Sequence, residues 1–194
     1  MSAGTRQQLL RGALTGAGLL ALEALSEAPS AWGVPYHPRS SHDQEGLVTL
    51  RAGESLGEQL YRHGAGLSLD AAVQRALAAA RTAKHQHVRS LTALVARGGA
   101  SPQLISHQFS QRDQLSVLAL AVRVENTLLG AYTEVLLGLD DLPSVGGTLA
   151  SLAAVDARLA ARLALLARQP AVPSPFNDPL PRYQSQGMFQ VGAQ

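Results

Sequence analysis

The sequence contains no cysteine, which excludes disulfides, thiol catalysis, zinc fingers and cysteine-ligated iron–sulfur clusters. Any metal must therefore be held by histidine and carboxylate side chains. Aromatic residues are also scarce, at 4% of the 194 residues, whereas an all-β sandwich would require more aromatic and β-branched residues. Charged residues make up 15% of the chain and nearly cancel, leaving a formal net charge of +2. We therefore expect neither the clustered basic surface of a nucleic-acid-binding protein nor an acidic tail.

Alanine and leucine, in contrast, are abundant, and both are strong helix formers. Apolar residues reach 46% of the chain, which is enough to form a packed core and argues against a disordered chain. The length suits one domain of ordinary size. The composition thus predicts an all-α protein.

The N-terminal segment, residues 1–31, has the organisation of an export signal. A basic segment, R-Q-Q-L-L-R at 6–11, is followed by an apolar run at 12–22 and by small residues at 26–31. This is the order of regions in a signal peptide. The stretch T-R-Q-Q-L-L-R resembles a twin-arginine signal in which Gln7 replaces the second arginine. We therefore expect export to the periplasm or the cell envelope.

Cleavage of this signal is expected after Ala28 or Ala31, between which the sequence does not choose. The apolar run is too short for a membrane-spanning helix, which needs roughly 20 apolar residues. We therefore expect no stable membrane span in the mature chain. The alternative interpretation is an amphipathic N-terminal helix interrupted by Glu23.

The rest of the chain divides into a linker, a helical bundle and an arm. Prolines and the lack of an apolar period indicate a linker at 32–44. Apolar residues then recur every three to four positions throughout the bundle, 45–168, which predicts helices. The arm, 169–194, has five prolines within twelve residues and cannot be helical there, so it should be extended. The expected helices are 45–62, 68–97, 112–138 and 144–168, with Ser68 and Ser144 as N-caps and Gly138 as a stop; Phe176, Leu180, Tyr183 and Phe189 are candidates to pack on the bundle.

The links between these segments predict the topology. The first and second helices, like the third and fourth, are joined by short links, which favour antiparallel neighbours. The link between the second and third helices, residues 97–111, has fifteen residues and can reach about 50 Å. A 24-residue helix is about 36 Å long, so this link can cross the whole bundle. Two antiparallel hairpins joined by one long crossover form the ferritin-like four-helix arrangement.

Each expected helix carries a polar residue on its apolar stripe. These residues are Glu54 on the first helix, Lys84 and His87 on the second, Glu125 on the third and Asp156 on the fourth. Because a buried charge is costly unless it is paired or bound to a metal, we expect them to converge at mid-bundle. Di-iron bundles use one Glu from each of two helices and a Glu-x-x-His from each of the other two.

Several stretches resemble the exported bacterial ferritin-like domain proteins related to plant desiccation-related proteins. The resemblance covers roughly residues 45–181, and the family typically has two E-x-x-H motifs. Against that pattern, Lys84 replaces one carboxylate, Asp156 replaces the other, and Leu159 replaces the second histidine. The stretches that carry the resemblance are G-E-S-L-G-E-Q-L-Y (53–61), K-H-Q-H-V-R-S-L (84–91), V-E-N-T-L-L-G-A-Y (124–132) and P-A-V-P-S-P-F-N-D-P-L (170–180).

The charges of these residues bear on whether metal is bound. Three carboxylates and one lysine give −2 when His87 is neutral, which suits one divalent cation. A metal-free centre with His87 charged and one carboxylate protonated is the other possibility. We expect the Lys84 ammonium inside the centre, paired with Glu54 or Glu125, and we do not expect a working di-metal oxidase.

Three functional hypotheses remain open. The first is a non-catalytic structural or stress-related protein, acting as a homo-oligomer or with an envelope protein partner. The second is a mononuclear Fe- or Mn-binding protein or weak oxidase, with Glu54, His87, Glu125 and Asp156 as ligands. The third is a carrier of an apolar ligand, held in a cavity beside the small side chains of Ala76, Ala79, Ala80 and Ala83.

Overall fold

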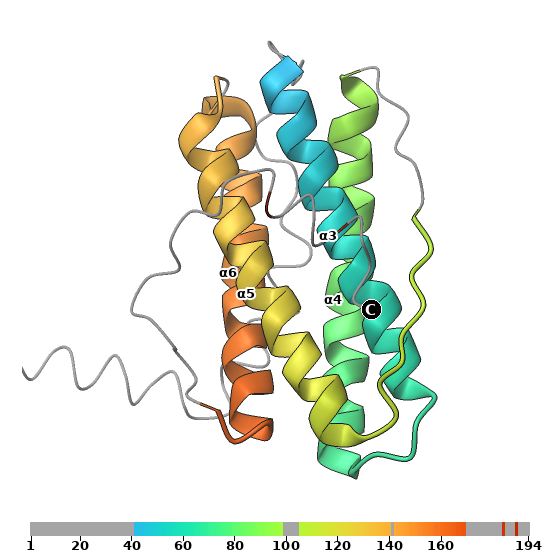
Figure 1. Cartoon of the computed structure of the whole chain (residues 1–194). Coiled ribbons are helices and arrows are strands. Elements are labelled where there is room, and N and C mark those ends of the chain that lie inside the picture. The colour runs from blue at the N-terminus through green and yellow to red at the C-terminus, as the bar shows by residue number, and fades with distance from the viewer. Residues whose placement is uncertain (1–40, 99–104, 141, 170–183, 185–188, 190–194) are drawn as a thin grey trace, which may run out of the picture. The chain divides into compact units, whose positions relative to one another are not determined.

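Four long helices make up most of the part of the chain that the structure, a computed structural model, describes (Figure 1). This part comprises residues 41–98, 105–140, 142–169, 184 and 189. No strand occurs within these ranges, which confirms the predicted all-α fold. The expected signal peptide, 1–31, lies outside the described residues. The helices are α3 (Ser41–Ala65), α4 (Ala71–Arg97), α5 (Gln114–Gly138) and α6 (Leu142–Leu166).

The helices form two antiparallel hairpins, α3–α4 and α5–α6 (Figure 1). α4 ends at one end of the bundle and α5 begins at the other, as the long crossover requires. The described part of this crossover, 105–113, is held along α3 by the side chain of Gln59. Its Nε2 donates to the carbonyl of Ile105 at 2.9 Å, and its Oε1 accepts from the amide of His107 at 3.0 Å. The ferritin-like topology expected from the link lengths is therefore present.

The first helix begins earlier than expected, at Ser41, so residues 41–44 are helical and do not belong to the linker. Tertiary contacts stabilise this first turn. The carboxylate of Asp43 is buried and accepts from the backbone amide of Asp140 at 3.1 Å. Gln44 donates to the carbonyl of Val95 at 3.0 Å. Such long-range contacts leave no mark on the apolar period, which is why the sequence placed the start too late.

The two expected serine N-caps were wrong. α4 begins after Asp70, whose carboxylate accepts from Gln114 Nε2 at 2.9 Å instead of capping its own helix. α6 begins at Leu142, two residues before Ser144, with Pro143 in the first turn, where its missing amide hydrogen costs nothing. Gly138 is the last residue of α5, close to the stop that we expected.

The predicted apolar stripes face the interior of the bundle, and the core contains leucines and valines from all four helices. The expected arm contributes Phe189, which is fully buried. Its ring packs against Gly53, where a Cβ atom would lie only 2.7 Å from it. Phe176, Leu180 and Tyr183 lie outside the described residues. Of the four alanines suggested to line a cavity, Ala79 is exposed, while Ala76, Ala80 and Ala83 are buried in the core.

Within the described ranges, α5 is the one helix long and apolar enough to cross a membrane. Most of its apolar stretch is buried inside the bundle, and it carries the buried Glu125. Its composition is thus accounted for by its place in the core, since a helix that is buried on most sides is apolar on most sides.

Candidate functional site

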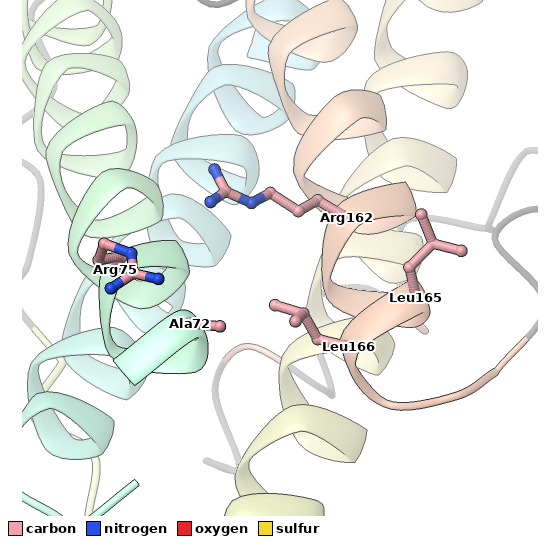
Figure 2. Close-up of a pocket in the computed structure, with 5 residues that line it drawn as sticks. All are labelled: Ala72, Arg75, Arg162, Leu165 and Leu166. Carbon is pink, nitrogen blue, oxygen red and sulfur yellow. The ribbon is translucent and has the colours of Figure 1, made fainter. Parts of the chain in front are cut away.

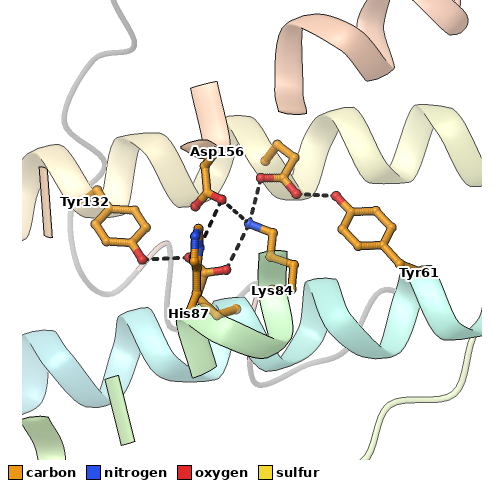
Figure 3. A network of polar contacts seen from close by, with 7 residues as sticks. Tyr61, Lys84, His87, Tyr132 and Asp156 are labelled. Atoms are coloured by element: carbon orange, nitrogen blue, oxygen red, sulfur yellow. Dashed lines mark hydrogen bonds and ion pairs between the residues drawn. The ribbon is translucent and has the colours of Figure 1, made fainter. Parts of the chain in front are cut away.

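The polar residues of the four helices converge at mid-bundle, as the sequence predicted. Glu54, Glu125 and Asp156 are fully buried, and His87 is 4% exposed. Lys84, also fully buried, lies among them. Two tyrosines complete a network of seven side chains (Figure 3). We call this the polar centre: Glu54, Tyr61, Lys84, His87, Glu125, Tyr132 and Asp156.

The ammonium of Lys84 is the hub of the polar centre. Its Nζ lies 2.7 Å from Asp156 Oδ1, 2.8 Å from Glu125 Oε2 and 2.9 Å from Glu54 Oε2. The sequence predicted pairing with Glu54 or Glu125, and the structure adds Asp156. An ammonium has three donors, so each can be directed at a different carboxylate. The lysine thus links the other three helices to α4.

A glycine on α3 makes room for this lysine. Gly57 lies one turn after Glu54, and a Cβ atom there would lie 3.2 Å from Cε of Lys84. The aliphatic part of the lysine therefore packs directly on the α3 backbone. Gly57 belongs to the stretch 53–61 but was not among the predicted site residues. The sequence signal that could have identified it is its position one turn after Glu54, on the helix face that also carries this glutamate.

His87 carries the second positive charge of the polar centre. Its Nδ1 lies 3.1 Å from Glu54 Oε1 and 3.4 Å from Asp156 Oδ1. Burial disfavours the charged imidazole, but the charge of Glu54 and hydrogen bonds to Asp156 and Glu54 outweigh it and raise the pKa of His87 to about 9. The imidazole is therefore protonated at neutral pH.

The two tyrosines close the polar centre at its ends (Figure 3). Tyr132 Oη donates to Glu54 Oε1 at 2.6 Å, and Tyr61 Oη donates to Glu125 Oε1. Burial and the neighbouring carboxylates raise the pKa of both phenols well above its usual value, so both remain donors. Both tyrosines are therefore core residues whose hydroxyls are hydrogen-bonded.

The carboxylates differ in how readily they ionise. Burial raises the pKa of Glu125 to about 7, with the charge of Lys84 opposing the rise. Burial and the charge of Glu54 raise the pKa of Asp156 as well. For Glu54 the charges of Lys84 and His87 overcome burial and hold its pKa below the usual value. Likewise, the three carboxylates overcome burial and raise the pKa of Lys84. Two cations thus face three carboxylates, of which one is partly protonated near neutral pH.

The residues present do not fit a two-metal centre. The Lys84 ammonium lies within 2.9 Å of all three carboxylates, and a cation cannot share that position with it. Leu159, at the position where the second imidazole is expected, is 8% exposed and packs in the core. One smaller possibility remains, because ligand atoms of Glu54, His87 and Asp156 lie within 4.8 Å of one another. Lys84 would have to move away before these three could hold one ion.

Comparison with known proteins agrees with this geometry. A family model described as the ferritin-like domain matches residues 42–169, which is more than half of the chain. Neither a search of curated proteins nor a search of solved structures found a significant match. The matched region covers α3 to α6 and with them every residue of the polar centre. The chain therefore belongs to the ferritin-like domain family.

Proposed function

We propose that this protein is an exported, non-catalytic ferritin-like protein in which an internal ammonium takes the place of a metal. One observation carries the proposal: Lys84 Nζ, fully buried, lies 2.7–2.9 Å from the three carboxylates that a metal would need. The positive charge is thus part of the chain, and the bundle needs no ion to compensate its buried acids. The role that follows is structural or stress-related.

The arrangement of the possible metal ligands supports a non-catalytic role. A metal-dependent oxidase needs a metal with protein ligands and at least one open position for its substrate. In the polar centre, hydrogen bonds from Lys84, Tyr61 and Tyr132 occupy carboxylate oxygens that would serve as ligands. On the second hairpin, the side chain of Leu159 has no atom that could bind a metal. These residues instead tie the four helices together through one buried network.

Metal titration tests the proposal. We would titrate Fe²⁺ and Mn²⁺ into the wild type, into Lys84→Glu and into Arg81→Glu, a matched charge reversal at an exposed position of α4. The wild type and Arg81→Glu should bind neither ion tightly and should not oxidise Fe²⁺. Lys84→Glu restores one Glu-x-x-His motif and should gain affinity. Tight binding with iron oxidation by the wild type would overturn the proposal whether or not Lys84→Glu folds.

A mononuclear Fe or Mn site is the second candidate function. The proximity of Glu54, His87 and Asp156 favours it, as does Asp156 Oδ2, a buried oxygen without a hydrogen bond in the described structure. Carboxylate and imidazole ligands suit Fe and Mn. This candidate predicts that the wild type binds one ion and that both Asp156→Asn and His87→Gln abolish the binding. If neither substitution changes the metal content, the candidate is wrong.

Export is proposed from the sequence of residues 1–31 alone. Its basic, apolar and small-residue regions follow one another in the order of a signal peptide. N-terminal sequencing of the native protein tests this proposal. A mature chain beginning shortly after Ala28 or Ala31 is the expected result, whereas a chain beginning at Met1 or Ser2 would contradict export.

A further inference from the structure

The charges on the surface of the bundle are unevenly distributed. α4 contains no acidic residue, and the single acidic residue of α6, Asp156, is buried. Every exposed charged residue of these two helices apart from a histidine is an arginine. Within the described ranges, the acidic residues outside the core lie on α3, on α5 and in the connecting segments. The balanced net charge had predicted no clustered basic surface, yet the fold separates the charges. The exposed arginines of α4 and α6 are Arg75, Arg81, Arg89, Arg97, Arg158 and Arg162.

Arg75 on α4 and Arg162 on α6 line one groove between the two helices, and helical periodicity places three more of these arginines close to them in angle. At 100° per residue, Arg89 and Arg97 lie within about 40° of Arg75 around α4 and extend over roughly 33 Å of its length. On α6, Arg158 and Arg162 are one turn apart. Arg81 points to another side of α4. Within the described ranges none of the five forms an ion pair. We call this set the arginine face: Arg75, Arg89, Arg97, Arg158 and Arg162.

A groove with an apolar lining opens at one end of the arginine face (Figure 2). It has a volume of about 330 Å³ and lies between the first turns of α4 and the last turns of α6. Arg75 and Arg162 flank it, and Leu165 stands beside it with 65% of its surface exposed. The lining is completed by Ala72 and Leu166. Guanidinium groups next to exposed apolar surface match a ligand with an anionic head and an apolar chain.

We propose that the arginine face binds an anionic lipid surface, with lipid phosphates paired to the arginines and Leu165 inserted at the acyl boundary. Arginine at a membrane surface attracts anionic lipid, and each one contributes roughly fivefold in affinity. Single-stranded nucleic acid fits less well, because α4 and α6 contain no Phe, Tyr or Trp on which a base could stack. Leu165 would also remain exposed against a phosphate backbone. The inference rests on the surface alone and is independent of the polar centre.

Vesicle co-sedimentation of the full chain tests this proposal. Phosphatidylcholine vesicles with and without phosphatidylglycerol would be compared for the wild type, for Arg75→Glu/Arg162→Glu and for Arg112→Glu/Arg123→Glu. The second double variant makes the same charge change at exposed positions of the crossover and of α5. The N-terminal segment is identical in all three chains, so any vesicle binding that it causes does not affect the comparison. Binding should require phosphatidylglycerol, weaken with salt, and fall at least tenfold in Arg75→Glu/Arg162→Glu but less than twofold in the control.

The contribution of apolar contacts to vesicle binding is tested by a second pair of matched variants. Leu165→Ala should weaken vesicle binding severalfold, whereas Leu137→Ala, at a leucine of α5 that is 76% exposed, should leave it unchanged. Equal losses in the two charge variants would overturn the proposal, because net charge would then explain the binding. Binding independent of phosphatidylglycerol would overturn it too. Tighter binding to nucleic acid than to vesicles at the same salt would assign the face to nucleic acid instead.

Discussion

The two helix hairpins supply equivalent residues to the polar centre but differ at the positions that would hold metal. Each hairpin begins with a helix that carries a glutamate and, seven residues later, a tyrosine: Glu54 and Tyr61 on α3, Glu125 and Tyr132 on α5. Each tyrosine donates to the glutamate of the other hairpin. These crossed hydrogen bonds make the two first helices of the hairpins alike in structure and in role.

The second helices of the hairpins differ. α4 has Lys84 and His87, spaced by three residues, while α6 has Asp156 and Leu159 at the same spacing. The first hairpin thus has a cation and an imidazole at these two positions, and the second has a carboxylate and an apolar side chain. The differences complement each other, because the lysine of one hairpin pairs with the aspartate of the other at 2.7 Å. The buried acids of the bundle are thereby paired with cations of the chain itself.

Removing the cation of the first hairpin should have the largest effect. Lys84→Met keeps most of the side-chain volume but leaves buried carboxylates uncompensated, so the free energy of unfolding should fall by about 3–5 kcal/mol. Guanidinium denaturation measures this change in the free energy of unfolding. The matched control, Arg81→Met, changes an exposed basic residue of the same helix and should stay within about 0.5 kcal/mol of wild type. Equal stability of the two variants would show that Lys84 compensates nothing.

The second cation of that hairpin should give a pH-dependent stability. The folded pKa of His87, about 9, is above the ordinary 6.5, so its contribution is complete below pH 6.5 and disappears as pH rises through 9. The free energy of unfolding should fall by roughly 3 kcal/mol across this window. Glu125, whose pKa rises from 4.5 to about 7, adds a fall of the same sign at lower pH.

Denaturation of His87→Gln across this pH range isolates the histidine. The fall between pH 6.5 and 9 should largely vanish in this variant. His85→Gln, which changes a histidine of the same helix with a side chain that is 61% exposed, should retain it. A wild-type slope in His87→Gln would contradict a charged imidazole in the polar centre.

The crossed tyrosine bonds predict equal effects in the two hairpins. Tyr61→Phe and Tyr132→Phe each remove one donor from a buried carboxylate, and each should cost about 1–3 kcal/mol of unfolding free energy. Thermal or chemical denaturation of both single variants gives the comparison. A loss in one variant and none in the other would break the equivalence of α3 and α5.

The smallest effect is expected at the glycine beside the lysine. Gly57→Ala places a methyl group 3.2 Å from Lys84 Cε and should lower the unfolding free energy by about 1 kcal/mol, despite the better helix propensity of alanine. Gly147→Ala on α6 meets nothing within 4 Å and should raise it by about 0.5–1 kcal/mol. If both substitutions stabilise the protein, Lys84 does not need the space at Gly57.

Much of the polar centre could be predicted from the sequence, because helical periodicity is a local property. A repeat of three to four residues was enough to identify the stripes that contain Glu54, His87, Glu125 and Asp156. These residues do converge in the structure. The reach of Lys84 to all three carboxylates could not be predicted, since it depends on the spacing between α3 and α4.

Other features depend on contacts between distant segments. The start of α3 at Ser41 depends on the hydrogen bond from Asp140 to Asp43, ninety-seven residues apart. The protonation of His87 depends on two carboxylates from other helices. The arginine face was hidden by a net charge of +2, because composition does not record which helices carry the acids and which lie side by side.

The metal content of the native protein tests the central claim most directly. The protein would be purified without chelators from cells grown with added iron and manganese, and both metals would be measured by mass spectrometry together with the protein concentration. The lysine-centred account predicts iron and manganese far below one ion per chain in a folded, soluble preparation. One ion or more per chain, lost on Asp156→Asn, would contradict it and would show that Lys84 yields its place to a metal.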